Sequence, residues 1–175
     1  NKGTIMGICG GLQMLGTTLE DPYLKEGPKN NSEQKIKGIG LLPLKTTFSE
    51  KKLTRQINSE SLWPCQSKIN GFEIHNGQTE LDDMQSSLTI KPIFNDLNLG
   101  WYKENKEGGT IVGIYIHGIF ENDNWRDQYI NLIRKSKNLP TLNKKSISYK
   151  KKRESIIDNL AKEFDKHLNI TSLLS

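Results

Sequence analysis

The chain has 175 residues, of which 34% are hydrophobic and 26% are charged, and its formal net charge is +5. This length suits one domain with a real core and is too short to argue for two. No signal peptide and no apolar run of bilayer-spanning length is recognisable, so we expect a cytoplasmic protein that does not bind membranes. Two cysteines make no disulfide framework and lack metal-ligand spacing, so we expect no metal site.

The basic surplus gathers near the C-terminus, where six Lys or Arg residues lie between positions 144 and 153. Such a run is a possible nucleic-acid patch. It leads into a helix and is accompanied by a single aromatic residue, Tyr149. We therefore interpret it as a solvated surface and expect no nucleic-acid partner.

A cysteine between glycines follows the first predicted strand. Thr4–Ile8 is a short apolar run, Cys9 comes next, and a helix is expected from Gly10 to about Thr18. Gly7-x-Cys9-x-Gly11 is the cysteine form of a nucleophile elbow, in which a Cβ at either glycine is expected to collide with nearby backbone. The N-terminus of the helix is expected to lower the pKa of the thiol. The alternative is a buried cysteine in a glycine-rich turn.

The middle of the chain is predicted to be rich in strands. A long polar loop over residues 25–37 separates it from the first helix. Cys65 has no glycine elbow and no helix after it, so we interpret it as a packing residue. Gly108-Gly109 predicts a hairpin turn. The strands are expected at 40–48 (with Pro43 at an edge or bulge), 53–57, 69–77, 88–94, 100–103 and 110–116.

Within the segment Ile69–Gly77, Phe72 and Ile74 alternate with Glu73 and His75. This period of two is typical of a half-buried strand, with the Glu and the His on one face. The pair could be metal ligands or an acid–base pair. On its own, the pattern favours two hydrated groups on a sheet surface.

The strand at 110–116 delivers His117 to its carboxyl end, followed by Gly118. Ligands bind at such strand ends in open α/β sheets, although a core histidine is the plain alternative. Asp123 is expected to cap the next helix, which ends near residues 138–140. The last helix, about residues 147–167, has an amphipathic face that is expected to dock on the body of the protein.

Three segments in this order carry a resemblance. They are Gly-Ile-Cys9-Gly-Gly-Leu-Gln13-Met-Leu-Gly, Gly71-Phe-Glu-Ile-His75-Asn-Gly and Tyr115-Ile-His117-Gly-Ile-Phe. They resemble the glutaminase domain of the cobyric acid synthase family, within the class I, triad-type glutamine amidotransferases of cobalamin biosynthesis. The resemblance runs from about residue 3 to about residue 133.

The resemblance implies an α/β fold, a flavodoxin-like three-layer sandwich with a central, mostly parallel sheet, a β-rich middle and a C-terminal helix. Residues 1–140 would be the amidotransferase domain, and residues 141–175 a helix packed on it. Cys9 would attack the carboxamide of glutamine, and His117 would transfer protons. The Gly10 N–H would be one oxyanion donor. The remaining expected substrate-binding residues are Gln13, Glu73, His75 and Asn76.

The resemblance also implies an N-terminal, ATP- and Mg-dependent synthetase domain that amidates adenosylcobyrinic acid a,c-diamide, the corrinoid partner. The chain starts at Asn1 without methionine, so we interpret it as a C-terminal portion whose first strands and second oxyanion donor lie upstream. Studied alone, it is expected to fold poorly or to show little glutaminase activity.

One departure from the family pattern concerns the third triad member. Class I enzymes usually have Glu two residues after the histidine, where this chain has Ile119, and the nearest carboxylate in sequence is Glu121. A Cys–His dyad or a carboxylate from elsewhere is the expected arrangement. The alternatives are a cobyrinic acid a,c-diamide synthase domain, an amidotransferase subunit of a cell-wall ligase, and a catalytically silent partner domain.

Overall fold

Two β-sheets organise the chain in the computed structural model, which describes residues 3–26, 34–82, 89–105, 108–142 and 148–167. The first sheet has the order β1-β8-β7-β6. Its strands are β1 (Ile5–Ile8), β8 (Thr110–Ile114), β7 (Gly100–Glu104) and β6 (Lys91–Pro92). β1 runs parallel to β8, and the other neighbours are antiparallel. Gly108 and Gly109 both have positive φ, as a tight turn between β7 and β8 requires.

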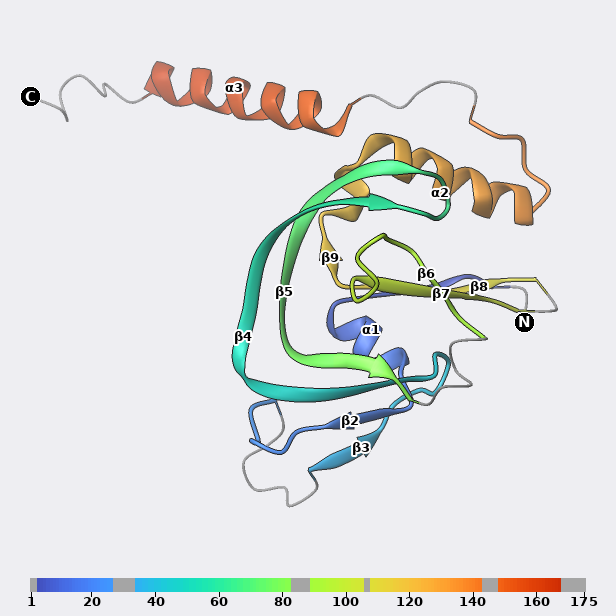
Figure 1. The fold of residues 1–175 in the computed structure, drawn as a ribbon. Coiled ribbons are helices and arrows are strands. Elements are labelled where there is room, and N and C mark those ends of the chain that lie inside the picture. Colours follow the sequence, from blue (N-terminus) through green and yellow to red (C-terminus); the bar gives the residue numbers. More distant parts are fainter. Residues whose placement is uncertain (1–2, 27–33, 83–88, 106–107, 143–147, 168–175) are drawn as a thin grey trace, which may run out of the picture.

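The second sheet has the order β3-β2-β4-β5-β9. Its strands are β2 (Thr18–Glu20), β3 (Lys35–Lys37), β4 (Leu44–Ser61), β5 (Ser67–Leu81) and β9 (Ile116–His117). β4 and β5 form one long antiparallel hairpin that curves around the first helix (Figure 1). A register shift between Thr47 and Lys52 interrupts the pairing, and a bulge of this kind bends a ribbon.

Several predicted strands have different limits in the structure. The segments 46–48 and 53–57 are parts of the single strand β4, which begins after Pro43. β5 continues four residues beyond Gly77, to Leu81. Only Lys91–Pro92 of the predicted strand 88–94 forms a strand, and Leu88 lies outside the described residues, as do residues 27–33 of the polar loop.

The mixed α/β architecture is confirmed, whereas the mostly parallel sheet is not found in the described part of the chain. There, each sheet contains one parallel pair, β1–β8 and β2–β4. The other neighbours are antiparallel: β4–β5 and β7–β8 are joined by short connections, whereas β9 returns to β5 after β6, β7 and β8. The flavodoxin-like three-layer sandwich stays a prediction.

Three α-helices accompany the sheets in the described part of the chain. α1 (Gly10–Leu15) is shorter than predicted, since Gly16 ends it and β2 follows. A Cβ at Gly16 would lie 2.5 Å from the carbonyl oxygen of Leu44, so the chain must pass this point as glycine. A 3-10 turn, η2 (Ile119–Glu121), leads into α2 (Asp123–Ser136), whose N-cap is Asn122 rather than the predicted Asp123.

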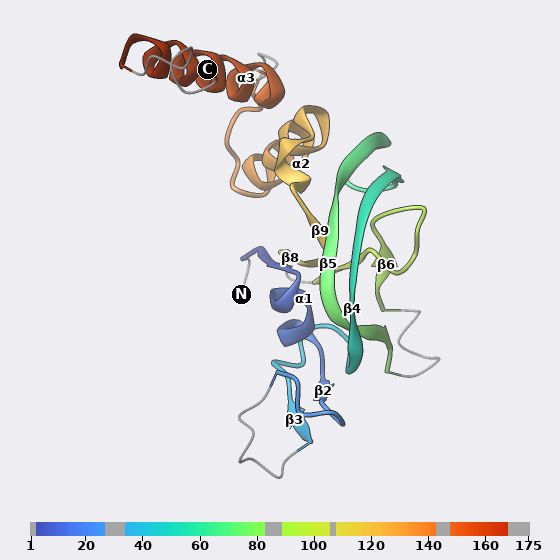
Figure 2. The same ribbon diagram turned by 90° about the vertical axis from the view of Figure 1, so that its left-hand side faces the viewer.

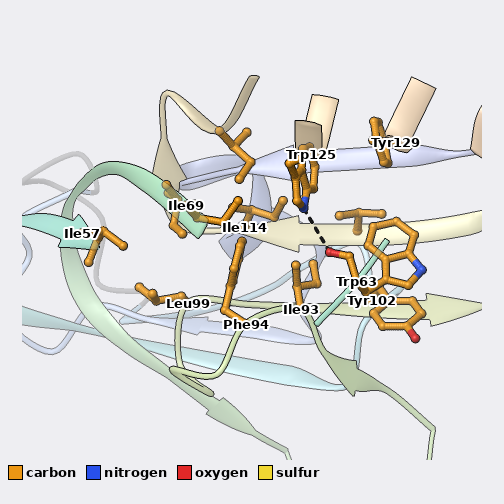
Figure 3. Packing of buried hydrophobic residues seen from close by; sticks show 13 residues of the cluster. Ile57, Trp63, Ile69, Ile93, Phe94, Leu99, Tyr102, Ile114, Trp125 and Tyr129 are labelled. Carbon is orange, nitrogen blue, oxygen red and sulfur yellow. Dashed lines mark hydrogen bonds between the residues drawn. The ribbon is translucent and has the colours of Figure 1, made fainter. Parts of the chain in front are cut away.

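The larger hydrophobic core lies between the two sheets and α2 (Figure 3). Trp125 of α2 is fully buried and donates from its indole nitrogen to the carbonyl oxygen of Trp63 at 3.0 Å. Tyr129 stacks on Trp125 at 5.1 Å between ring centroids. Burial of large aromatic side chains of this kind contributes much of the stability of a small domain. α2 thus covers one side of this core with Trp125 and Tyr129.

The last helix, α3 (Tyr149–His167), does not dock as predicted. Its apolar side chains Ile156, Leu160 and Phe164 are 50–58% exposed, and none of its residues is buried. In both views α3 lies beyond α2, at the end of the molecule farthest from β2 and β3 (Figures 1 and 2). The apolar face is therefore not buried in the described residues, and α3 contacts the body through polar groups: the Tyr149 N–H donates to Asp123, and Arg153 pairs with Glu121. The division of the chain at residue 140 stays a prediction.

Candidate active site

The turn at Cys9 has the strained geometry of a nucleophile elbow. Cys9 has φ 55° and ψ −113°, a conformation that side chains other than glycine rarely adopt. Its backbone N–H donates to the carbonyl oxygen of Ile114 at 2.8 Å, so β1 and β8 fix the turn from both sides. The predicted elbow is therefore present.

The two glycines of the elbow differ in what they require. A Cβ at Gly7 would lie 2.4 Å from the carbonyl oxygen of Gly11 and 2.7 Å from Leu15. At Gly11 itself, no heavy atom lies within 4 Å of an added Cβ. The expected collision is confirmed at Gly7 and wrong at Gly11, because it is the backbone of Gly11 that approaches Gly7.

The thiol of Cys9 is partly buried and donates to the carbonyl oxygen of Ile74 in β5 at 3.3 Å. Burial raises the pKa of Cys9, while the backbone N–H of Gly10 and the positive charge of Lys52 lower it only in part. The negative charge of Glu26 raises it further. The predicted lowering is thus wrong in sign, since desolvation outweighs the helix N-terminus. A thiol of this kind needs a base.

His117 is delivered by β9, whose pairing with β5 sets the histidine opposite Phe72. Cross-strand partners share a face of the sheet, so His117 and the Cys9 thiol lie against the same three-residue stretch of β5, from Phe72 to Ile74. The Nε2 atom of His117 is buried and has no hydrogen-bond partner among the described residues. An orphaned buried nitrogen is costly unless a ligand or a reacting group completes it.

The carboxylate nearest to His117 in sequence is engaged elsewhere. Glu121 forms an ion pair with Arg153 of α3 at 3.0 Å. Ile119, at the usual position of the triad glutamate, is buried. The third member of a triad therefore stays unassigned.

Three of the expected substrate-binding residues, Gly10, Gln13 and Asn76, lie at the elbow. Gln13 of α1 donates from Nε2 to the carbonyl oxygen of Asn76 at 3.0 Å and to the hydroxyl of Tyr115 at 3.2 Å. Asn76 lies two residues beyond Ile74 on β5, on the same face of the strand. Gly10 contributes its backbone N–H at the thiol. The structure thus brings Gly10, Gln13 and Asn76 to Cys9.

Glu73 and His75 lie on the opposite face of β5, and the expectation that they are hydrated is wrong. They are 3% and 8% exposed, whereas Phe72 is 50% exposed. The Glu73 carboxylate contacts Nε2 of His75 at 2.8 Å and is also bound by Arg55. The His75 ring stacks on Tyr115 with 3.7 Å between centroids. This buried face therefore supports the strand that carries Asn76.

Separate cavities accompany the two faces. One of about 780 Å³ is lined by Arg55, Glu73 and His75 and also by Lys52, and neither Cys9 nor His117 is part of its lining. Another of about 610 Å³ includes Ile8, directly before Cys9, and Gly118, directly after His117. The expected site residues therefore do not line one common cavity: Glu73 and His75 line the first, and residues next to Cys9 and His117 line the second.

Residues missed by the sequence reasoning complete the surroundings of the thiol. Tyr115 is buried and accepts from Gln13. Lys52 pairs with Asn76 in the β4–β5 ladder, and Glu26 accepts from the Asn76 side chain at 2.6 Å. Tyr115 stands two residues before His117, a signal that was available. The positions of Lys52 and Glu26 depend on a strand register and on a loop, which the sequence pattern does not specify.

Comparison with known proteins agrees with the geometry of this site. A family model described as the CobB/CobQ-like glutamine amidotransferase domain matches residues 1–125. The chain belongs to this family. The resemblance stated from the sequence is thereby confirmed.

Curated relatives carry the name cobyric acid synthase. The proteins of Prochlorococcus marinus strains MIT 9215 and AS9601 are each 82% identical over all 175 residues of the chain. That of strain NATL1A is 44% identical over 98% of the chain. The chain spans about a third of the length of these relatives, 34%, 34% and 35% respectively.

The described residues also bear on metal sites and on membrane spans. No group of three or more His, Cys, Asp or Glu side chains in this part of the chain could hold a metal ion. None of the helices in the described ranges combines the length and apolar character that crossing a bilayer requires.

Proposed function

We propose that this amidotransferase domain hydrolyses glutamine and supplies the ammonia to the remainder of a cobyric acid synthase. The observation that carries the proposal is the buried, partnerless Nε2 of His117, which lies against the same stretch of β5 as the elbow thiol. A base with a free nitrogen is what a thiol with a raised pKa requires.

The proposed reaction has two stages. Cys9 Sγ bonds to the carboxamide carbon as its proton passes to His117, and the oxyanion accepts from the Gly10 N–H. The C–N bond then breaks, His117 returns the proton to the leaving ammonia, and a glutamyl thioester remains. Water, deprotonated by His117, attacks the thioester and releases glutamate and the thiol.

The ammonia would then be used by an ATP-dependent synthetase portion that amidates adenosylcobyrinic acid a,c-diamide. The name of the relatives supports this choice, and their additional length leaves room for such a portion. ATP and Mg would bind there, and no step assigned here to the present chain involves them. We propose a cytoplasmic location, where a reducing environment keeps Cys9 as a free thiol.

The test uses the full-length protein with either glutamine or an ammonium salt as the nitrogen donor. Cys9→Ala is expected to abolish amidation with glutamine and to leave amidation with ammonium salt unchanged, because only the supply of ammonia is removed. Cys65→Ser is the matched control and is expected to keep both activities. Glutamine-dependent amidation that survives in Cys9→Ala would contradict the proposal.

A further inference from the structure

Two charged side chains of opposite sign flank Asn76 beside the elbow. We propose that Lys52 binds the α-carboxylate of the substrate glutamine and that Glu26 binds its α-ammonium group. This inference rests on the proposed glutaminase function and names the residues that recognise a free amino acid.

Glu26 is held in place from two directions. Its backbone N–H and that of Lys25 both donate to the carboxylate of Asp21, each at 2.9 Å. Its side-chain Oε1 accepts from Asn76 Nδ2 at 2.6 Å. Its second carboxylate oxygen has no hydrogen-bond partner among the described residues, and the side chain is exposed, so one acceptor stays available to a ligand. An ammonium group supplies the matching donor.

Lys52 lies directly opposite Asn76 in the antiparallel ladder between β4 and β5. Cross-strand partners project from the same face, so the register places Lys52 on the face of Asn76, and its side chain also borders the cavity of about 780 Å³. Its side chain is exposed and forms no ion pair with any described residue. A carboxylate at this place would therefore find a cation that no other group occupies.

The electrostatics of the thiol support this placement independently. The charge of Lys52 lowers the pKa of Cys9 and the charge of Glu26 raises it, so both charges act at the nucleophile. Both charges act in the direction expected for groups beside the thiol, which agrees with the placement that the ladder and the Asn76 contact give.

The spacing along β5 matches the length of glutamine. Cys9 contacts Ile74, and the two charges flank Asn76, two residues farther on. Two residues of a strand span about 6.6 Å, which is of the order of the distance from the carboxamide of extended glutamine to its α-substituents. A thiol at one end and paired charges at the other thus select a free amino acid over glutamine within a peptide.

The test uses the full-length protein and three substrates whose hydrolysis releases ammonia. They are glutamine, glutaramate, which lacks the α-ammonium group, and 4-aminobutanamide, which lacks the α-carboxylate. Lys52→Met is expected to raise KM roughly ten-fold for glutamine and glutaramate, and to leave KM for 4-aminobutanamide unchanged. Glu26→Gln is expected to raise KM for glutamine and 4-aminobutanamide but not for glutaramate.

Testing each variant with each substrate distinguishes a lost binding contact from a change in the pKa of Cys9. A change in the pKa of Cys9 would alter all three reactions alike, whereas a lost contact affects only substrates that carry its partner group. Lys68→Met and Glu104→Gln make the same charge changes at exposed positions away from the elbow and are expected to leave every KM unchanged. Wild-type kinetics with the substrate that lacks the partner group, 4-aminobutanamide for Lys52→Met and glutaramate for Glu26→Gln, report that the amidotransferase domain of each variant is folded.

The outcomes distinguish the inference from the function on which it rests. A wild-type protein that releases no ammonia from glutamine overturns the proposed function and this inference with it. A wild-type protein that hydrolyses glutamine, with variants that lose affinity for all three substrates equally or for none, overturns the inference alone.

Discussion

The two faces of β5 differ in composition and in their relation to the chemistry. One face carries Glu73 and His75, which are buried in a network with Arg55 and Tyr115. The other carries Phe72, half exposed, and Asn76 beside the elbow. The difference indicates that polar contacts hold the face of Glu73 and His75, while His117 is paired with the open, half-exposed face at Phe72.

The largest effect is expected from the histidine on the open face. His117→Ala should lower kcat for glutamine hydrolysis by about 10³-fold or more, because the thiol of Cys9 loses its base. The midpoint of urea unfolding should stay close to that of the wild type, since the orphaned Nε2 stabilises nothing. Steady-state kinetics and urea titration measure the two. A stability loss in proportion to the loss of activity would show that His117 is a structural residue.

The buried face should respond in the opposite way. Glu73→Ala leaves His75 without its carboxylate partner in a buried site, which should reduce the free energy of unfolding by about 2 to 3 kcal/mol. Urea denaturation measures the loss, with Glu104→Gln as an exposed control that should change little. If Glu73→Ala were as stable as the wild type, the network would not be what fixes β5.

The pH dependence of alkylation tests the raised pKa of Cys9, whose thiol contacts β5 at Ile74. Burial raises the folded-state pKa of Cys9 above that of an unfolded chain. The stability contributed by the protonated thiol is therefore fully present below the unfolded pKa and is lost as pH rises through the folded pKa. In a Cys65→Ser background, iodoacetamide alkylation should reach half its maximal rate at a higher pH in the native than in the urea-unfolded protein. A lower native midpoint would mean that Cys9 is a preformed thiolate.

The smallest effect is expected at the exposed aromatic of the open face. Phe72→Thr replaces a side chain that is 50% exposed with a strand-forming residue, so the free energy of unfolding should change by about 0.5 kcal/mol or less. The same urea titration measures it. A loss as large as that of Glu73→Ala would remove the distinction between the faces.

The elbow and His117 could be predicted from sequence because their signals are local. A cysteine between glycines after an apolar strand specifies its own turn, and the strained φ of Cys9 agrees with it. The collision at Gly7 was foreseeable as a close backbone approach. Whether the collision occurs at Gly7 or at Gly11 depends on how α1 packs against β1. The sequence pattern does not specify this packing.

The faces of β5 could not be assigned from sequence for a physical reason. Alternation of Phe72 and Ile74 with Glu73 and His75 identifies two faces but not which of them meets the core. Here the polar face is buried, because Arg55 from β4 binds Glu73, and Tyr115, which lies between β8 and β9, stacks on His75. Similarly, the amphipathic pattern of α3 predicts a face suited to burial and says nothing about whether a partner covers it.

The central claim is that Cys9 is the nucleophile that forms a thioester with glutamine. An electrophilic glutamine analogue incubated with the full-length protein, followed by peptide mass spectrometry, tests this claim most directly. The label is expected on Cys9 alone, with excess glutamine slowing its incorporation and with loss of glutamine-dependent activity in step. Labelling of Cys65, or complete loss of that activity with Cys9 unmodified, would contradict the account.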